Sequence, residues 1–172
     1  MKTIQLTQGQ VALVDDEDYE RLNAFKWQAH FDPKSRSFYA CRKARSERKR
    51  FKVSMHRDVA GVNPGYVVDH INRNTLDNRR ENLRICLSAE NSCNSRKKYS
   101  FKRRTTSKFK GVSWRDDRAK WRARIEVQGN DVSLGCFDDE LDAARAYDAA
   151  ALKLHGEFAC TNTMLFGEEL LG

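Results

Sequence analysis

The stretch VVDHINRNTLDNRRENLRICLSAEN, residues 67–91, decides the fold of the N-terminal half of the chain. It opens with an apolar run that predicts a short strand ending on two ionisable residues, Asp69 and His70. The Asn- and Arg-rich residues 71–82 predict a loop, and residues 83–87 predict a second strand. Ser88 is a suitable cap for a helix from residue 89 to about residue 98. This order of strand, loop, strand and helix indicates an α+β fold.

The residues before this stretch predict further strands and short helices. Trp27 and Phe31 are the expected core anchors, because large aromatic side chains favour the interior. A short helix that starts at Met55 is expected to end at Gly61, since glycine commonly follows the last turn of a helix. Strands are predicted around residues 4–6, 11–13, 38–41 and 51–53, and helical turns at 16–23.

The C-terminal third predicts a small three-stranded antiparallel sheet with one packed helix. Apolar and polar residues alternate in three short runs, at 112–115, 121–127 and 132–134. A helix capped by Asp138 or Asp139 follows these runs. One helix covers only one face of such a sheet, so the polar face is expected to be exposed. Because that face carries Arg122 and Arg124 on one strand, it is a candidate surface for an acidic partner.

Positive charge is distributed unevenly along the 172 residues, whose net charge is +8. Residues 1–94 carry 17 basic and 12 acidic groups, residues 95–108 carry seven basic and none acidic, and residues 109–172 carry eight basic and 12 acidic. We therefore predict an N-terminal domain (1–94), a basic linker (95–108) and a C-terminal domain (109–172). Like charges in the linker repel one another, which favours an arm that follows nucleic acid over a plain solvated linker. A second basic cluster, residues 42–52, is a hairpin tip, an exposed strand pair or a solubilising loop.

Composition excludes several classes of protein. Hydrophobic residues make up 40% and aromatic residues 10%, which is too apolar for a disordered chain. No apolar run approaches the roughly 18 residues of a membrane span, and the start of the sequence lacks the apolar core of a signal peptide. Five cysteines without a CxxC pair fit a reducing compartment and argue against a zinc cluster. We expect a cytoplasmic protein without a membrane partner.

Separated motifs mark the C-terminal domain over about residues 108–163: KGVSW at 110–114, KWRARI at 120–125, LGCF at 134–137, DAARAYDAAA at 142–151, and Asn162. Together they resemble the Apetala/ethylene-response-factor (ERF-type) DNA-binding domain. The resemblance implies a sheet that lies in the major groove and contacts bases and phosphates. The contact residues that it implies are Lys110, Ser113, Arg115, Arg122, Arg124, Glu126 and Ser133. Because Ser113, Ser133 and Asp131 depart from the plant pattern, we do not expect a plant-type target preference.

The N-terminal domain carries MHRDVA at 55–60, VVDHINRNTLDNRRENLRIC at 67–86 and ENSCN at 90–94. Over about residues 50–96 these motifs resemble the HNH homing endonucleases of phages and other mobile elements. The resemblance implies a ββα-metal nuclease module. The catalytic residues that it implies are Asp69, His70, Asn82 and Asn91.

The chemistry of phosphodiester hydrolysis fits this set of residues. It needs a water made nucleophilic near neutral pH and a cation that takes up charge on the leaving oxygen. His70 suits the general base, because imidazole has an ordinary pKa near 6.5. Asp69 and Asn91 offer hard oxygen ligands for Mg²⁺ or Mn²⁺, and zinc is not expected. Asn82 is expected to brace the loop so that His70 keeps its orientation.

Two further residues have open roles, and the placement of Asp69 and His70 at one site is also open. Neighbouring strand residues point to opposite faces, so a bulge or twist at the strand end is expected to bring Asp69 and His70 to one site. His56 matches a position of the family, and a buried, hydrogen-bonded role is favoured over a catalytic one. Asn78 braces the loop as Asn82 does, or forms an Asx-turn.

The sequence therefore predicts a site-directed DNA endonuclease that uses one divalent metal and chooses its target with the C-terminal sheet. The alternatives are a DNA-binding transcription regulator with an inactive nuclease half, and a non-specific defence or toxin nuclease. Double-stranded DNA is the expected partner of a monomer or weak dimer in a bacterial or phage-infected cell. The expected phosphate contacts of the linker are Arg96, Lys97, Lys98, Lys102, Arg103 and Arg104.

Overall fold

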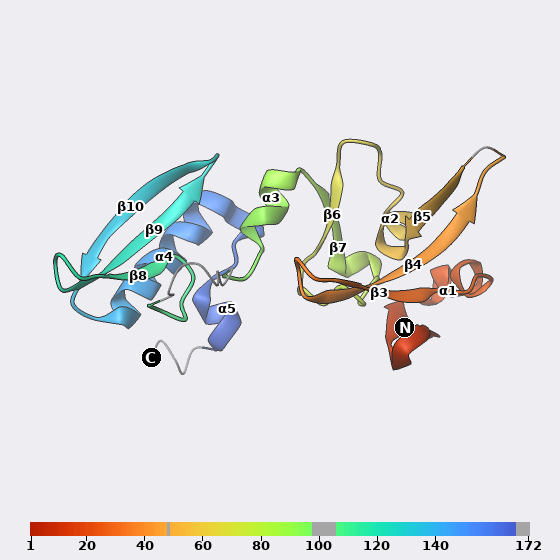
Figure 1. Ribbon diagram of the computed structural model, residues 1–172, viewed down its shortest axis with the longest axis horizontal. Helices are drawn as coiled ribbons and strands as arrows, with labels where there is room; N and C mark the ends of the chain where they lie inside the picture. Colours follow the sequence, from red (N-terminus) through yellow and green to blue (C-terminus); the bar gives the residue numbers. More distant parts are fainter. Residues whose placement is uncertain (48, 98–105, 168–172) are drawn as a thin grey trace. The chain divides into compact units, whose positions relative to one another are not determined.

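A computed structural model describes residues 1–47, 49–97 and 106–167 of the chain. The chain divides into two compact units, unit 1 from Met1 to Asn91 and unit 2 from Ser92 to Gly172. Both units combine antiparallel sheets with a few helices (Figure 1), as predicted. The boundary between the units lies three residues before the predicted end of the N-terminal domain at residue 94. The extent of the basic linker stays a prediction, because most of it lies outside the described residues.

Unit 1 is built from small antiparallel sheets, in which β1 pairs with β2, β4 lies between β3 and β5, and β6 pairs with β7. The strands are β1 (Lys2–Gln5), β2 (Val11–Val14), β3 (Gln28–Asp32), β4 (Ser37–Arg45), β5 (Arg50–Ser54), β6 (Val67–His70) and β7 (Leu83–Cys86). The helices are α1 (Asp16–Asn23) and α2 (Met55–Ala60), with 3-10 turns η1 (Thr7–Gly9) and η2 (Arg80–Asn82). Helix α3 (Ser88–Cys93) contains the boundary between the two units.

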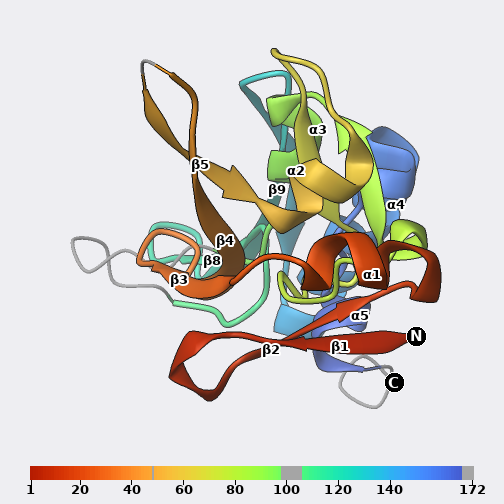
Figure 2. The same cartoon turned by 90° about the vertical axis from the view of Figure 1, so that its right-hand side faces the viewer.

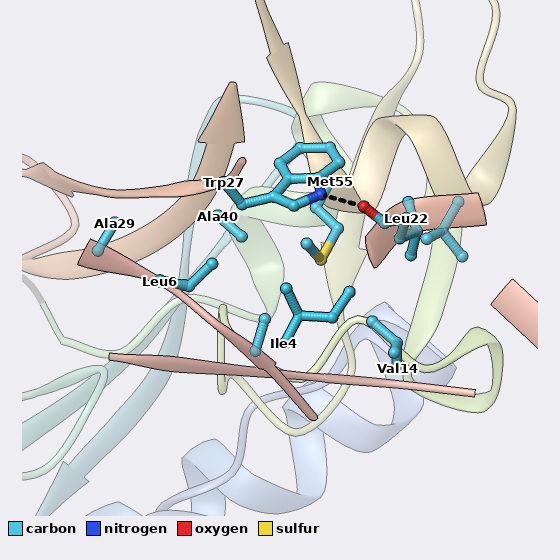
Figure 3. Close-up of a cluster of buried hydrophobic side chains, with 10 residues drawn as sticks. Ile4, Leu6, Val14, Leu22, Trp27, Ala29, Ala40 and Met55 are labelled. Carbon is cyan, nitrogen blue, oxygen red and sulfur yellow. Dashed lines mark hydrogen bonds between the residues drawn. The ribbon is translucent and has the colours of Figure 1, made fainter. Parts of the chain in front are cut away.

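Met55, the first residue of α2, lies in the hydrophobic core of unit 1 (Figure 3). Trp27 is buried there, and its indole nitrogen donates to the carbonyl of Leu22 at 2.8 Å. Met55 is fully buried in the same cluster, so core packing fixes the first residue of α2. Phe31 is 47% exposed, and the prediction that it anchors the core is wrong. It lies near the end of β3, where its ring packs against Phe38 at the border of the core, with ring centroids 5.2 Å apart.

The helix that follows β7 is shorter than predicted. It ends at Cys93 instead of reaching about residue 98. Beyond Cys93 the chain turns, and the amide of Ser95 donates to the carbonyl of Ser92 at 3.2 Å. Within unit 2, the ammonium of Lys97 then donates to three main-chain carbonyls, those of Ser107, Phe109 and Val112, at 2.7–3.0 Å. These contacts are non-local, so the sequence pattern does not contain them.

Unit 2 is a three-stranded antiparallel sheet in the order β10-β9-β8, with α4 packed on one face (Figure 1). Asp139 caps α4 with its side chain, which accepts from the amides of Leu141 and Asp142. Ala123 and Ile125 on β9 are buried on the side of α4. The elements are β8 (Val112–Arg115), β9 (Lys120–Val127), β10 (Asn130–Phe137), α4 (Glu140–His155), η3 (Gly156–Phe158) and α5 (Asn162–Phe166). No helix in the described ranges is both long enough and apolar enough to cross a membrane.

Candidate active site and DNA-binding face

His70 is the last residue of β6, and only 5% of its surface is exposed. Its ring lies edge-on to the ring of His56 on α2, with centroids 5.2 Å apart, and to that of Tyr39 on β4, at 6.3 Å. Burial lowers the pKa of His70, against smaller raising effects from a hydrogen bond with the Asn78 side chain and from the charge of Asp69. The ring is therefore neutral at neutral pH, which is the form that accepts a proton.

Asp69 precedes His70 and is held by a different partner. Its Oδ2 atom accepts from Arg84 Nε at 2.9 Å and from Arg84 Nη2 at 2.6 Å. Arg84 is the residue opposite Asp69 in the pairing of β6 with β7, and that pairing runs without a register shift to the pair of His70 and Leu83. The expected bulge is therefore absent. Both side chains are buried at the strand end, with His70 against α2 and Asp69 against Arg84.

Asn82 closes the loop that follows β6. Its side-chain oxygen accepts from the amide of Asn72 at 2.9 Å, and its side-chain nitrogen donates to the carbonyl of Asp77 at 2.8 Å. Its main-chain carbonyl accepts from the amide of Ile71 at 2.9 Å. These three hydrogen bonds fix the chain immediately after His70. Asn82 is itself buried, so solvent does not compete for its bonds.

The same loop pairs with β2, which the sequence pattern did not reveal. Leu13 donates its amide to the carbonyl of Leu76 at 2.8 Å and accepts from the amide of Asn78 at 2.8 Å. Asn78 is 1% exposed, and its side chain donates to the carbonyl of Leu76 at 3.0 Å. Asn78 is thus tied to β2 and to the core of unit 1. Of the two roles considered for Asn78, the contacts fit bracing.

His56 lies beside His70 but has a different electrostatic environment. Its pKa is lowered to about 3, first by burial and then by the charges of His70, Arg57 and Lys52. Among the residues that the structure describes, its buried Nδ1 atom has no hydrogen-bond partner. The expected burial is therefore present, while that ring nitrogen lacks the expected hydrogen bond.

Asn91 lies on α3, half-buried, with its amide bonded to the carbonyl of Leu87 at 3.1 Å. Within the described part of the chain, no group of three or more His, Cys, Asp or Glu side chains is placed to hold a metal. The predicted ligands, one carboxylate and one amide, do not form a group of that kind. All five cysteines are free thiols.

The polar face of the sheet in unit 2 carries several of the predicted DNA contacts. Arg124 is exposed and forms an ion pair with Asp131 at 2.5 Å. Arg115 forms an ion pair with Asp117 at 2.5 Å. Arg122 is half-buried and makes no salt bridge with any described residue. Ser113 lies opposite Arg122 in the register, Ser133 opposite Arg124, and Glu126 opposite Asp131.

Two of the lysines that were predicted to contact DNA donate hydrogen bonds to main-chain carbonyls within unit 2. Lys110 donates from its ammonium to the carbonyls of Cys93 and Ser95, both at 2.7 Å. Lys97 donates to three carbonyls and is half-buried, and burial lowers its pKa. Neither ammonium is presented to a partner in this arrangement, so we do not propose them as DNA contacts. Arg96 is exposed, and the predicted contacts Lys98, Lys102, Arg103 and Arg104 lie outside the described residues.

Comparison with known proteins matches two separate segments of the chain to families. Residues 59–93 match the HNH endonuclease family, and residues 107–157 match the AP2 domain. Protein 3.8 of Escherichia phage T7 is 35% identical over 95 residues, which cover 55% of this chain and 74% of protein 3.8. The chain belongs to the family of phage T7 protein 3.8. It combines an HNH endonuclease segment with an AP2-type domain.

The AP2 half also has plant relatives. The AP2-like ethylene-responsive transcription factor PLT2 of Arabidopsis thaliana is 45% identical over 69 residues, and CRL5 of Oryza sativa subsp. japonica is 44% identical over 69 residues. Each match covers 39% of this chain, but only 12% of the length of PLT2 and 11% of the length of CRL5. The similarity is therefore confined to a small part of the plant proteins.

Proposed function

We propose that the chain is a site-directed DNA endonuclease that hydrolyses phosphodiester bonds with one divalent cation. The observation that carries the proposal is a buried, neutral His70 at the end of β6, followed by a loop that Asn82 closes with three hydrogen bonds. His70 accepts the proton of the attacking water, and Asn82 holds the backbone on which the ring is oriented. The match to HNH endonucleases over residues 59–93 supports this assignment.

The donor set fits a hard cation. Asp69 and Asn91 are the proposed ligands, because a carboxylate and an amide oxygen suit Mg²⁺ or Mn²⁺ and leave coordination positions for water and phosphate. Arg84 donates to Oδ2 of Asp69 from both Nε and Nη2, so the guanidinium fixes the orientation of the carboxylate. The cation, when bound, supplies charge that stabilises the phosphate in the transition state. We propose β6, β7 and α3 as the ββα-metal module.

Target choice is proposed to lie in the polar face of the sheet of unit 2. Arg122 is the strongest candidate for a base contact, since Arg124 and Arg115 are already paired with aspartates. Contacts to phosphates hold a protein on any duplex, whereas contacts to base edges select the sequence. Arg122→Ala should therefore lower discrimination between target and scrambled duplexes by about 1–3 kcal/mol. Arg145→Ala on α4 is the control, and an equal loss on both duplexes would assign Arg122 to phosphate contact.

The test of the activity itself is cleavage of a supercoiled plasmid with and without Mg²⁺. We expect nicked or linear product from the wild type only when the metal is present, and none from Asp69→Ala at any Mg²⁺ concentration. Binding without cleavage under every metal condition would favour the DNA-binding regulator. Cleavage of all duplexes at one rate would favour the non-specific nuclease.

A further inference from the structure

Strands β4 and β5 continue past β3 as a two-stranded ribbon. The pairing of β3 with β4 ends at the pair of Gln28 and Cys41, whereas the pairing of β4 with β5 runs on to Arg45 and Arg50. Figures 1 and 2 both show this ribbon projecting from unit 1. Two strands without a third are only marginally stable in water. The projection therefore calls for a functional explanation.

One face of the ribbon carries only cations. Lys43 lies directly opposite Lys52, and Arg45 directly opposite Arg50. Residues two apart on a strand share a face, so all four side chains lie together. Each of the four is exposed, and none forms a salt bridge with any part of the chain that the structure describes. We refer to Lys43, Arg45, Arg50 and Lys52 as the four-cation face.

The opposite face of the ribbon is turned toward the body of unit 1. Arg42 lies on that face, with its guanidinium 4.1 Å from the centre of the Phe25 ring and 5.4 Å from that of Trp27. The same guanidinium lies 3.4 Å from the carboxylate of Asp58. Since Trp27 belongs to the core, the four-cation face points away from the core.

The charge pattern of this face is unfavourable in the isolated protein. Like charges directly opposite each other destabilise an antiparallel pair, whereas opposite charges stabilise it. Lysines on exposed strands also prevent two sheets from pairing edge to edge. That role does not explain why both members of each pair are cations, because a carboxylate opposite the lysine would leave the protection unchanged. Two successive like-charged pairs therefore indicate a surface that an anion neutralises.

We propose that the four-cation face binds phosphates of the duplex DNA on which unit 1 acts. A two-stranded ribbon fits the major groove, which is about 12 Å wide. Cations two residues apart are separated by roughly 6.6 Å along a strand, close to the roughly 6.8 Å rise of two base-pair steps. The inference rests on the proposed endonuclease function and adds a DNA contact in unit 1 that is independent of the AP2-type domain.

The test measures the affinity of the full chain for a linear duplex over a series of salt concentrations, in EDTA so that no cleavage occurs. Phosphate contacts release counterions, so each lost contact flattens the slope of log affinity against log salt by about 0.9. We expect the variant Lys43→Gln/Arg45→Gln/Arg50→Gln/Lys52→Gln, which removes four contacts, to lower the slope by about 3.6. The variant Lys43→Arg/Arg45→Lys/Arg50→Lys/Lys52→Arg keeps the charges and should keep the slope.

The matched control removes four exposed cations elsewhere, with Lys26→Gln, Lys34→Gln, Arg36→Gln and Lys153→Gln in one chain. It has the same net charge as the first variant and should keep a slope near that of the wild type. The thermal midpoint of the first variant should not fall, because the substitutions remove repulsion. Equal slopes in wild type and first variant would overturn the inference while leaving endonuclease activity intact. A wild type that neither binds nor cleaves DNA would instead refute the proposed function.

Discussion

At the scale of single residues, the ion pair of Asp69 and Arg84 couples stability to the proposed metal site. The side chains of Arg84 and Asp69 are 12% and 7% exposed, so removal of the guanidinium leaves a buried carboxylate without its charge partner. We predict that Arg84→Ala lowers the free energy of unfolding by about 3 kcal/mol. Mg²⁺ should restore part of this loss, because a cation at Asp69 replaces the missing charge. Thermal unfolding with and without Mg²⁺ checks this, and the double variant Arg84→Ala/Asp69→Asn, as control, should lose the rescue by the metal.

His56 gives a second prediction at the same scale, for the dependence of stability on pH. Its pKa of about 3 in the folded chain lies below the ordinary value of 6.5, so between these values the unfolded state binds the extra proton. Stability is therefore lost as the pH falls from 6.5 toward 3. The groups that face His56 are Tyr39, His70, Arg57 and Lys52. His56→Phe should make the fall in unfolding free energy shallower, as measured by denaturant unfolding at a series of pH values.

The matched control for His56 is His30→Phe, which replaces an exposed ring. A His56→Phe variant that loses stability with acid as steeply as the wild type would show that His56 is protonated in the folded chain. The remaining dependence on pH in His56→Phe should include His70, whose pKa burial also lowers.

At the scale of elements, the packing of α4 against the sheet of unit 2 depends on a close approach at Gly111. Its φ is +76°, and a Cβ there would meet the Tyr147 ring and lie 2.6 Å from the carbonyl oxygen of Arg124. We predict that Gly111→Ala destabilises unit 2 by at least about 2 kcal/mol. Gly129 has a similar φ of +82° with open space around it, so Gly129→Ala isolates the cost of the backbone conformation. Equal losses in the two variants, measured by thermal unfolding, would contradict the steric explanation.

The elements also show which features of the fold are local enough to predict. Asp139, one of the two predicted caps, caps α4, because a cap acts within the first turn of a helix. The early end of α3 was not predictable, because it accompanies the contacts of Lys97 with carbonyls more than ten residues away. The same reason applies to Phe31, whose exposure depends on where the core ends and not on its own strand pattern.

At the scale of the whole molecule, the sequence predicted the combination of domains better than the contacts inside the candidate site. Motif spacing was enough to indicate an HNH endonuclease segment and an AP2-type domain. The pairing of Asp69 with Arg84 comes from strand register, and the bond of the Asn78 amide to Leu13 comes from the pairing of the loop with β2. The spacing of motifs in the sequence predicts neither of these two contacts. The hydrogen bonds of Lys97 and Lys110 to main-chain carbonyls could not be predicted either. In the sequence, a lysine that binds carbonyls looks the same as one that binds phosphate.

On the proposed function, the division into two units predicts that cleavage and target choice are separable, and His70→Ala tests this most directly. The measurement is the single-turnover cleavage rate with Mg²⁺, together with the affinity for the same duplex in EDTA, for wild type, His70→Ala and the exposed-site control His30→Ala. Loss of a general base should lower the rate by about 10²–10⁴-fold. The affinity should stay within about twofold of the wild type, because the ring is no phosphate anchor. A His70→Ala variant that keeps more than about a tenth of the rate, or that loses affinity in step with the rate, would contradict the account.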